Sequence, residues 1–176
     1  MHASANGEAF HPRRFAEDNT LCTLSDYFRA SEDDISRARF LSLALVYDSG
    51  GVYRSRDLEC FKPIDPIIDG HDAVVCAMGD WAGPCFFGAT PKHPWIKDIV
   101  DTLHEGWGTP GRPIDGWSLI KHVTKVTARH PEVKRIGDQY IVSLDPNGKP
   151  LKPLDDAYAV HTRIPNDDAG YDPSLC

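Results

Sequence analysis

The chain has 176 residues and a mass of 19.5 kDa, which fits one domain. Hydrophobic residues make up 41% and charged residues 26%, a composition typical of globular proteins that excludes a disordered chain. With 19 basic and 26 acidic side chains, the net charge is −7, which argues against nucleic acid or an anionic membrane as the main partner.

Two further classes are excluded by pattern. No apolar run approaches the roughly 20 residues that a membrane helix needs, and the first residues lack the apolar core of a secretory signal. We therefore expect no membrane segment and a cytoplasmic protein. The five cysteines are widely spaced without a Cys-x-x-Cys pair, which favours free, mostly buried thiols in a reducing compartment over a zinc site.

The chain begins with a polar segment, in which a short strand is expected at residues 14–16. A short helix is expected over 21–28, with Thr20 or Thr23 as its N-cap. A longer helix is expected over 31–48, because its apolar residues recur at steps of three and four.

The ends of this longer helix carry clear signals. Ser31 and Asp34 have the spacing of a capping pair, and Gly50 and Gly51 stop the helix because glycine adopts the left-handed conformation of a helix end. The segment 52–61 then reads as one strand interrupted by polar residues.

The second half alternates strands and helices. A strand buried on both faces is expected at 73–78 and a shorter one at 85–89, and helices are expected at 94–104 and 117–126. Short strands are expected near residues 133–136, 140–142 and 158–160. This alternation indicates an α/β fold, with one domain over 1–176, a core over about 20–163 and a polar tail over 164–176.

The segment from Leu43 to Asp65 carries the chemistry. A helix ending in Gly-Gly runs into a strand that ends with acidic Asp57. Ligands bind at strand ends in open α/β sheets, and a divalent cation held there neutralises a leaving diphosphate. From local spacing alone, a structural role of Asp57, as a strand-end cap or an ion-pair partner of Arg54 or Arg56, is favoured over metal binding.

This segment resembles the sugar-binding region of glycosyltransferase family 32, which includes initiating mannosyltransferases and capsular-polysaccharide enzymes. The matching residues are Gly50-Gly51-Val52-Tyr53, Asp57 and Lys62-Pro63-Ile64-Asp65. Residues 85–94 resemble the family's stretch ending in Gly-His-Pro, and residues 157–161 its closing Tyr-Ala-Val-His segment.

The resemblance implies a GT-A-like nucleotide-diphospho-sugar transferase fold, truncated at the N-terminus. It implies transfer of a hexose, mannose or galactose, from a nucleotide-sugar donor to a glycan acceptor. Asp57 corresponds to the ligand of Mn²⁺ or Mg²⁺. The residues implied in donor binding are Gly50, Gly51, Tyr53, Ser55, Arg56 and His161. Trp81, expected in a loop, is a candidate for contact with the acceptor.

The chain also departs from the family pattern. Ser55 stands where the Asp-x-Asp motif has its first aspartate, and Arg39 and Ser42 stand where the family has an Asp-x-x-Arg pair that contacts the donor sugar. Because the family begins with a strand and loop that bind the nucleotide base, the resemblance leads us to expect that residues 1–176 do not supply them. These departures favour an alternative, a catalytically inactive homologue that acts as a binding or accessory protein.

A third alternative is a domain completed by a partner chain, for which an exposed sheet edge would be the sign. A structure can distinguish the first two. A pocket at Asp57 lined by Gly51, Tyr53 and His161 favours the enzyme, and an Arg39 or Arg56 side chain that fills this pocket favours the inactive homologue.

Overall fold

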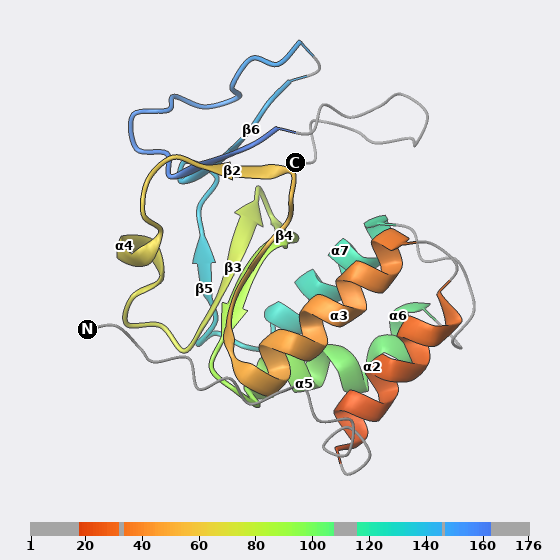
Figure 1. The fold of residues 1–176 in the computed structure, drawn as a ribbon. Coiled ribbons are helices and arrows are strands. Elements are labelled where there is room, and N and C mark those ends of the chain that lie inside the picture. Colours follow the sequence, from red (N-terminus) through yellow and green to blue (C-terminus); the bar gives the residue numbers. More distant parts are fainter. Residues whose placement is uncertain (1–17, 32–33, 108–115, 146, 163–176) are drawn as a thin grey trace.

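Two β-sheets and a group of helices make up the computed structural model of the chain, which describes residues 18–31, 34–107, 116–145 and 147–162 (Figure 1). The arrangement is a mixed α/β fold, as the alternation of helices and strands predicts. The strand expected at 14–16 and the tail over 164–176 lie outside the described residues.

Two helices open the described chain, α2 (Asn19–Ala30) and α3 (Asp34–Ser49). Their caps differ from the expected ones. The carboxylate of Asp18 accepts hydrogen bonds from the backbone N–H groups of Thr20 (2.9 Å) and Leu21 (3.3 Å), so the N-cap of α2 is neither Thr20 nor Thr23. Ser31 caps the C-terminus of α2, where its hydroxyl donates to the carbonyl of Tyr27.

The larger sheet has four strands in the order β1-β4-β3-β5. These are β1 (Gly51–Arg54), β4 (Trp81–Ala89), β3 (Ala73–Met78) and β5 (Lys134–Ile136). Strand β4 is antiparallel to both β1 and β3, whereas β5 is parallel to β3. Strands β1, β3 and β5 therefore point the same way, and their carboxyl ends meet at one edge of the sheet. Trp81 begins β4 and does not lie in the expected loop.

A smaller sheet of three strands lies across this edge (Figure 1). Its strands are β2 (Leu58–Cys60), β7 (Ala159–His161) and β6 (Ile141–Ser143), with β7 in the middle. The single strand expected over 52–61 is thus two strands that belong to different sheets. The one-turn helix α4 (Asp65–Ile68), which the sequence analysis did not predict, follows β2.

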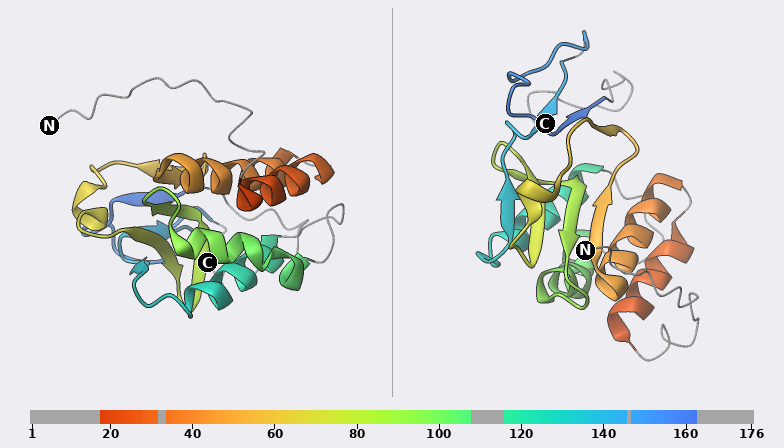
Figure 2. Two further views of the ribbon diagram at one scale, coloured as in Figure 1. Left: turned by 90° about the horizontal axis from the view of Figure 1, so that it is seen from below. Right: turned by 60° about the vertical axis from the view of Figure 1, so that its left-hand side comes forward.

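The remaining helices are α5 (Pro94–Asp101), α6 (Leu103–Trp107) and α7 (Gly116–Thr127), so the helix expected over 94–104 ends at Asp101. Figures 1 and 2 show these helices gathered with α2 and α3 beside the larger sheet. None of the helices in the described ranges has the length and apolar character required to cross a membrane.

Strand β3, in the interior of the larger sheet, is buried on both faces, as predicted. Val75 and Phe87 pack with side chains of α2, α3, α5 and α7 in one core. Val74, Cys76 and Phe86 point to the opposite face, where they pack with the smaller sheet and with isoleucines in and next to α4. This alternation follows from the two-residue period of a strand. It places the turn after β1 between two packed cores.

Candidate functional site

The turn that follows β1 joins the two sheets, and it contains the candidate metal ligand. The N–H of Ser55 donates to the carbonyl of Cys85 in β4 (2.7 Å), which ends the pairing of β1. The carbonyl of Ser55 then accepts a hydrogen bond from the N–H of Leu58 (3.1 Å). The hydroxyl of Ser55 accepts one from the N–H of Asp57 (3.1 Å). Serine favours such a turn because its hydroxyl bonds the backbone two residues ahead.

The smaller sheet brings the C-terminal candidate to this turn. The carbonyl of Asp57 accepts hydrogen bonds from the N–H (2.7 Å) and the hydroxyl (3.0 Å) of Thr162. The next residue, Leu58, pairs with His161. The Ser55–Asp57 turn and His161, far apart in the sequence, are therefore neighbours at the carboxyl ends of β1, β3 and β5.

The charged side chains of the turn face solvent to different degrees. The side chain of Arg56 is 92% exposed and that of Asp57 27%, and the Nε–Oδ1 distance between them is 3.7 Å. Such an exposed pair contributes little to stability. Of the two candidate partners, Arg56 forms this ion pair, and the guanidinium of Arg54 donates to the carbonyl of Leu58 (2.8 Å).

Tyr53 connects the turn with helix α3. Its ring packs on Phe87, with 5.2 Å between the ring centres. Burial raises the pKa of the Tyr53 hydroxyl, Arg39 acts to lower it, and Cys85 and Asp57 raise it further. The charges of Arg39 and Asp57 thus shift the pKa of the same hydroxyl in opposite directions. The sequence analysis marked Arg39 as a departure from the family pattern and as a candidate side chain for filling the pocket, and its effect on Tyr53 emerges from the fold.

The two candidate glycines lie at the other end of β1. Both have a positive φ, +71° at Gly50 and +106° at Gly51, and the N–H of Gly50 closes α3 by donating to the carbonyl of Val46. Since a strand rises about 3.4 Å per residue, the length of β1 separates Gly51 from Arg54 by about 10 Å. The structure does not bring the glycines together with the Ser55–Asp57 turn, and their visible role is to redirect the chain.

A cavity lies between the larger sheet and the helices, on the side of Arg39. It is small, with about 20 Å³ open to the centres of water molecules, which is room for about one water. Its wall includes Arg39, Ser42, Phe87 and Trp95, so it lies beneath α3 and does not include Asp57. Arg39 borders this cavity, and Arg56 is in solvent.

The donor set for a metal ion is sparse. In the described ranges no three histidine, cysteine, aspartate or glutamate side chains are grouped so that they could hold a metal ion. Divalent cations such as Mg²⁺ require about six oxygen ligands, and Asp57 supplies a single carboxylate. These residues do not fit a cation held by the protein alone, and no chemical step is derived through one.

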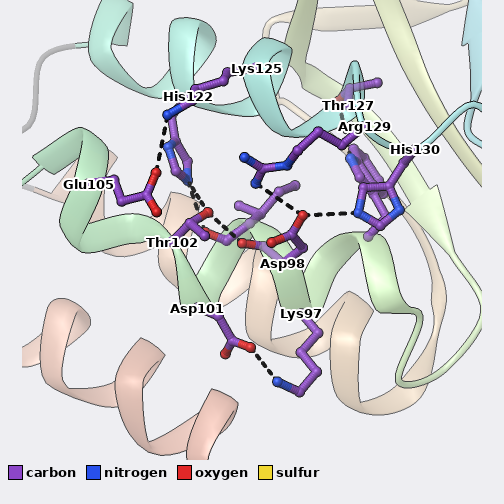
Figure 3. Close-up of polar contacts among 12 residues, drawn as sticks. Lys97, Asp98, Asp101, Thr102, Glu105, His122, Lys125, Thr127, Arg129 and His130 are labelled. Carbon is purple, nitrogen blue, oxygen red and sulfur yellow. Dashed lines mark hydrogen bonds and ion pairs between the residues drawn. The ribbon is translucent and has the colours of Figure 1, made fainter.

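A polar network on α5 and α7 is separate from the turn (Figure 3). Asp98 accepts hydrogen bonds from Arg129 (3.0 Å) and His130 (3.1 Å), which hold the pKa of its carboxyl below the usual value against the opposing effect of burial. His122 is buried, and its Nε2 lies 3.0 Å from the carbonyl of Ile99. The contact of His122 joins α7 to α5, and those of Asp98 join α5 to the residues that follow α7.

The chain is similar to a known sugar transferase over part of its length. It is 32% identical over 65 residues to inositol phosphoceramide mannosyltransferase 1 of Schizosaccharomyces pombe, a match that covers 34% of this chain and 19% of that protein. No family model matches the chain, and no solved structure matches it. The chain spans about a fifth of its relative's length. The comparison supports a glycosyltransferase-like relationship for about a third of the chain.

Proposed function

We propose that this chain is a glycosyltransferase-like protein with a GT-A-like fold that transfers a hexose, mannose or galactose, from a nucleotide sugar to a glycan acceptor. The observation that carries the proposal is the position of Asp57. Its turn lies where the parallel strands of the larger sheet end, beside His161. Ligands of open α/β sheets bind at such edges. Similarity to a mannosyltransferase over about a third of the chain supports a sugar donor as the ligand.

Each residue of the turn has a role in this proposal. The exposed guanidinium of Arg56 pairs with diphosphate oxygens, for which its planar donor fork is suited. His161 contributes a further donor from β7. The Asp57 carboxylate accepts hydrogen bonds from donor hydroxyls, and the proposal keeps Mn²⁺ or Mg²⁺ as an ion that accompanies the diphosphate. The acceptor hydroxyl attacks the anomeric carbon, and the nucleoside diphosphate leaves.

Calorimetric titration tests the proposal directly. The purified chain is titrated with UDP, GDP and their hexose conjugates, each with and without Mn²⁺. We expect binding of one nucleotide family. Asp57→Asn should weaken it by about 10-fold or more, since a hydrogen bond to a charged group contributes about 1.5–3 kcal/mol. The matched control is Glu59→Gln, which makes the same charge change at an exposed position of β2 and should bind as the wild type does.

Two results would overturn the proposal. One is the absence of binding for every nucleotide at millimolar concentration. The other is equal affinity of Asp57→Asn and the wild type, which would remove Asp57 from the site. Binding that is identical with and without Mn²⁺ would reject the metal and retain the donor site.

The second candidate function is that of an inactive homologue that binds a partner. Two observations favour it: the single carboxylate at the turn, and the position of β1 at an edge of the larger sheet as described, with Val52 exposed. An open sheet edge is a template for pairing with another chain. A protein that binds the donor yet releases no nucleoside diphosphate with any acceptor glycan, and that co-purifies from its host with one protein, would support this candidate. Release of nucleoside diphosphate would reject it.

A further inference from the structure

Two cysteine side chains meet between β3 and β4. The Sγ atoms of Cys76 and Cys85 are 3.2 Å apart, and the thiol of Cys76 also donates to the carbonyl of Gly83 (3.1 Å). Since Cys76 donates to that carbonyl, the Cys85 thiol is the donor to the Cys76 sulfur. Neither residue was assigned a function above, and both are free thiols.

An irregularity in β4 produces this contact. Strand β3 pairs Val75 with Phe87 but pairs the next residue, Cys76, with Gly83. The residues in between, including Cys85, therefore form a bulge with no partner in β3. Bulges re-aim side chains, and this one turns Cys85 toward Cys76.

We propose that Cys76 and Cys85 form a redox modification site that closes a disulfide on exposure to a peroxide. A disulfide has an S–S length of about 2.05 Å, so the two sulfur atoms need to approach by only about 1 Å. A bulge in a hairpin can supply such a shift without moving the rest of the sheet.

The reaction proceeds in two balanced steps. The Cys85 thiolate attacks one peroxide oxygen, the O–O bond breaks, and a sulfenic acid and hydroxide form. The Cys76 sulfur then attacks the Cys85 sulfur, the S–O bond breaks, and the oxygen leaves as water with the proton from Cys76. The two thiols lose two electrons in total, which reduce the peroxide to two water molecules. Cys85 is assigned the first step because it is the less buried residue of the pair, with Cys76 only 1% exposed.

The surroundings of Cys85 set the pace of the first step. Its hydrogen bond to Cys76, together with burial, raises the pKa of the Cys85 thiol well above its usual value. Since the thiolate is the nucleophile, the reaction is slow at neutral pH and accelerates as the pH rises.

Formation of the disulfide should alter the structure of the Ser55–Asp57 turn. The carbonyl of Cys85 accepts the hydrogen bond from Ser55 that ends β1 (2.7 Å). A change in the bulge therefore reaches the turn through one backbone contact. The modification itself is independent of sugar transfer, so its test needs no nucleotide.

The experiment uses hydrogen peroxide on the whole chain at pH 7 and pH 9. The reaction is stopped with an alkylating reagent, the protein is cleaved after Met78, between the two cysteines, and the fragments are analysed by mass spectrometry. We expect the two fragments to stay joined by the disulfide until a reductant is added. The disulfide should form faster at pH 9 than at pH 7. In Cys76→Ser, Cys85 should accumulate as a trappable sulfenic acid. In Cys85→Ser, Cys76 should remain a thiol while exposed Cys60 is oxidised.

Two outcomes would overturn the proposal. One is that Cys76 and Cys85 are both still alkylated when Cys60 is fully oxidised. The other is that Cys85 proceeds to sulfinic acid while Cys76 stays free. Hydrogen exchange provides the second readout: oxidation should change the exchange rate of the Ser55 amide. The amide of Thr90, which bonds to the Asp72 carbonyl near the opposite end of β3 and β4, should keep its rate.

Discussion

At the scale of single residues, Gly50 has one role that the sequence predicts and another that only the structure shows. The Gly-Gly pair predicts a helix stop, and the positive φ of Gly50 agrees with it. The second reason for glycine is distant in sequence, because a Cβ on Gly50 would lie 2.7 Å from the Cδ of Pro91. No local sequence pattern predicts the contact with Pro91.

Replacement by alanine separates the two reasons. We expect Gly50→Ala to reduce the free energy of unfolding by about 2–4 kcal/mol, from left-handed strain and from the clash with Pro91. The matched control is Gly70→Ala, which has a similar φ of +78° but nothing within 4 Å of the new Cβ, and which should cost about 1 kcal/mol. Urea denaturation measures both. Equal losses would show that Pro91 moves aside.

Asp57 illustrates a second limit at this scale. Its spacing after the Gly-Gly pair predicts the end of a strand, and the structure places it in the turn between β1 and β2. The neighbours that give the turn its context, Thr162 and His161, come from the last described strand. The family resemblance supplied His161 but not Thr162, because hydrogen bonding to a backbone carbonyl leaves no sequence motif.

At the scale of elements, polar residues at helix starts were the hardest to assign. Asp18, Thr20 and Thr23 all have side chains that cap helices, and the sequence analysis favoured the threonines. Asp18 is the cap because its carboxylate accepts two backbone N–H groups and also pairs with Lys92, with 3.0 Å between Oδ2 and Nζ. The pairing with Lys92 is a tertiary contact that single-sequence reasoning does not supply.

The cap gives the prediction at this scale. Asp18→Ala should reduce the free energy of unfolding by about 0.5–2 kcal/mol, because α2 loses its cap. The control is Asp26→Ala, which removes an exposed carboxylate within the same helix and should change stability by less than about 0.5 kcal/mol. Thermal unfolding followed by circular dichroism measures both variants. An Asp18→Ala protein as stable as Asp26→Ala would show that the cap is replaceable.

The prediction of a single strand over 52–61 was wrong for a related reason. Its polar and apolar residues are compatible with one strand, but β1 pairs with β4 and β2 pairs with β7. The division at Ser55 depends on which distant strand each half meets. Strand β3, by contrast, was predicted correctly because a continuous apolar run is itself the signature of burial on both faces.

At the scale of the whole molecule, the α/β class was predictable and the sheet order was not. Alternating helices and strands indicate the class. The antiparallel β4 between β1 and β3 could not be read from the same pattern, because strand direction leaves no mark on periodicity. The candidate site depends on this strand order, because the order places the carboxyl ends of β1, β3 and β5 at the same edge of the sheet.

Global stability should also depend on pH through buried histidines. Burial lowers the pKa of His122 and of His93 below the usual value. The unfolded chain then takes up protons at a higher pH than the folded protein does. The free energy of unfolding is therefore fully retained above about pH 7 and falls as the pH decreases below about 6.5, by up to about 1.4 kcal/mol per pH unit for each proton.

His122→Gln tests this coupling. Urea denaturation from pH 7 to pH 5 should show a shallower loss of stability in His122→Gln than in the wild type, because one buried titrating group is gone. At pH 7 the variant should be less stable, since the contact of His122 with the Ile99 carbonyl, which links α7 to α5, is disturbed (Figure 3). His71→Gln, at an exposed position, should keep the wild-type slope. Equal slopes for His122→Gln and the wild type would show that His122 keeps its ordinary proton affinity in the folded protein.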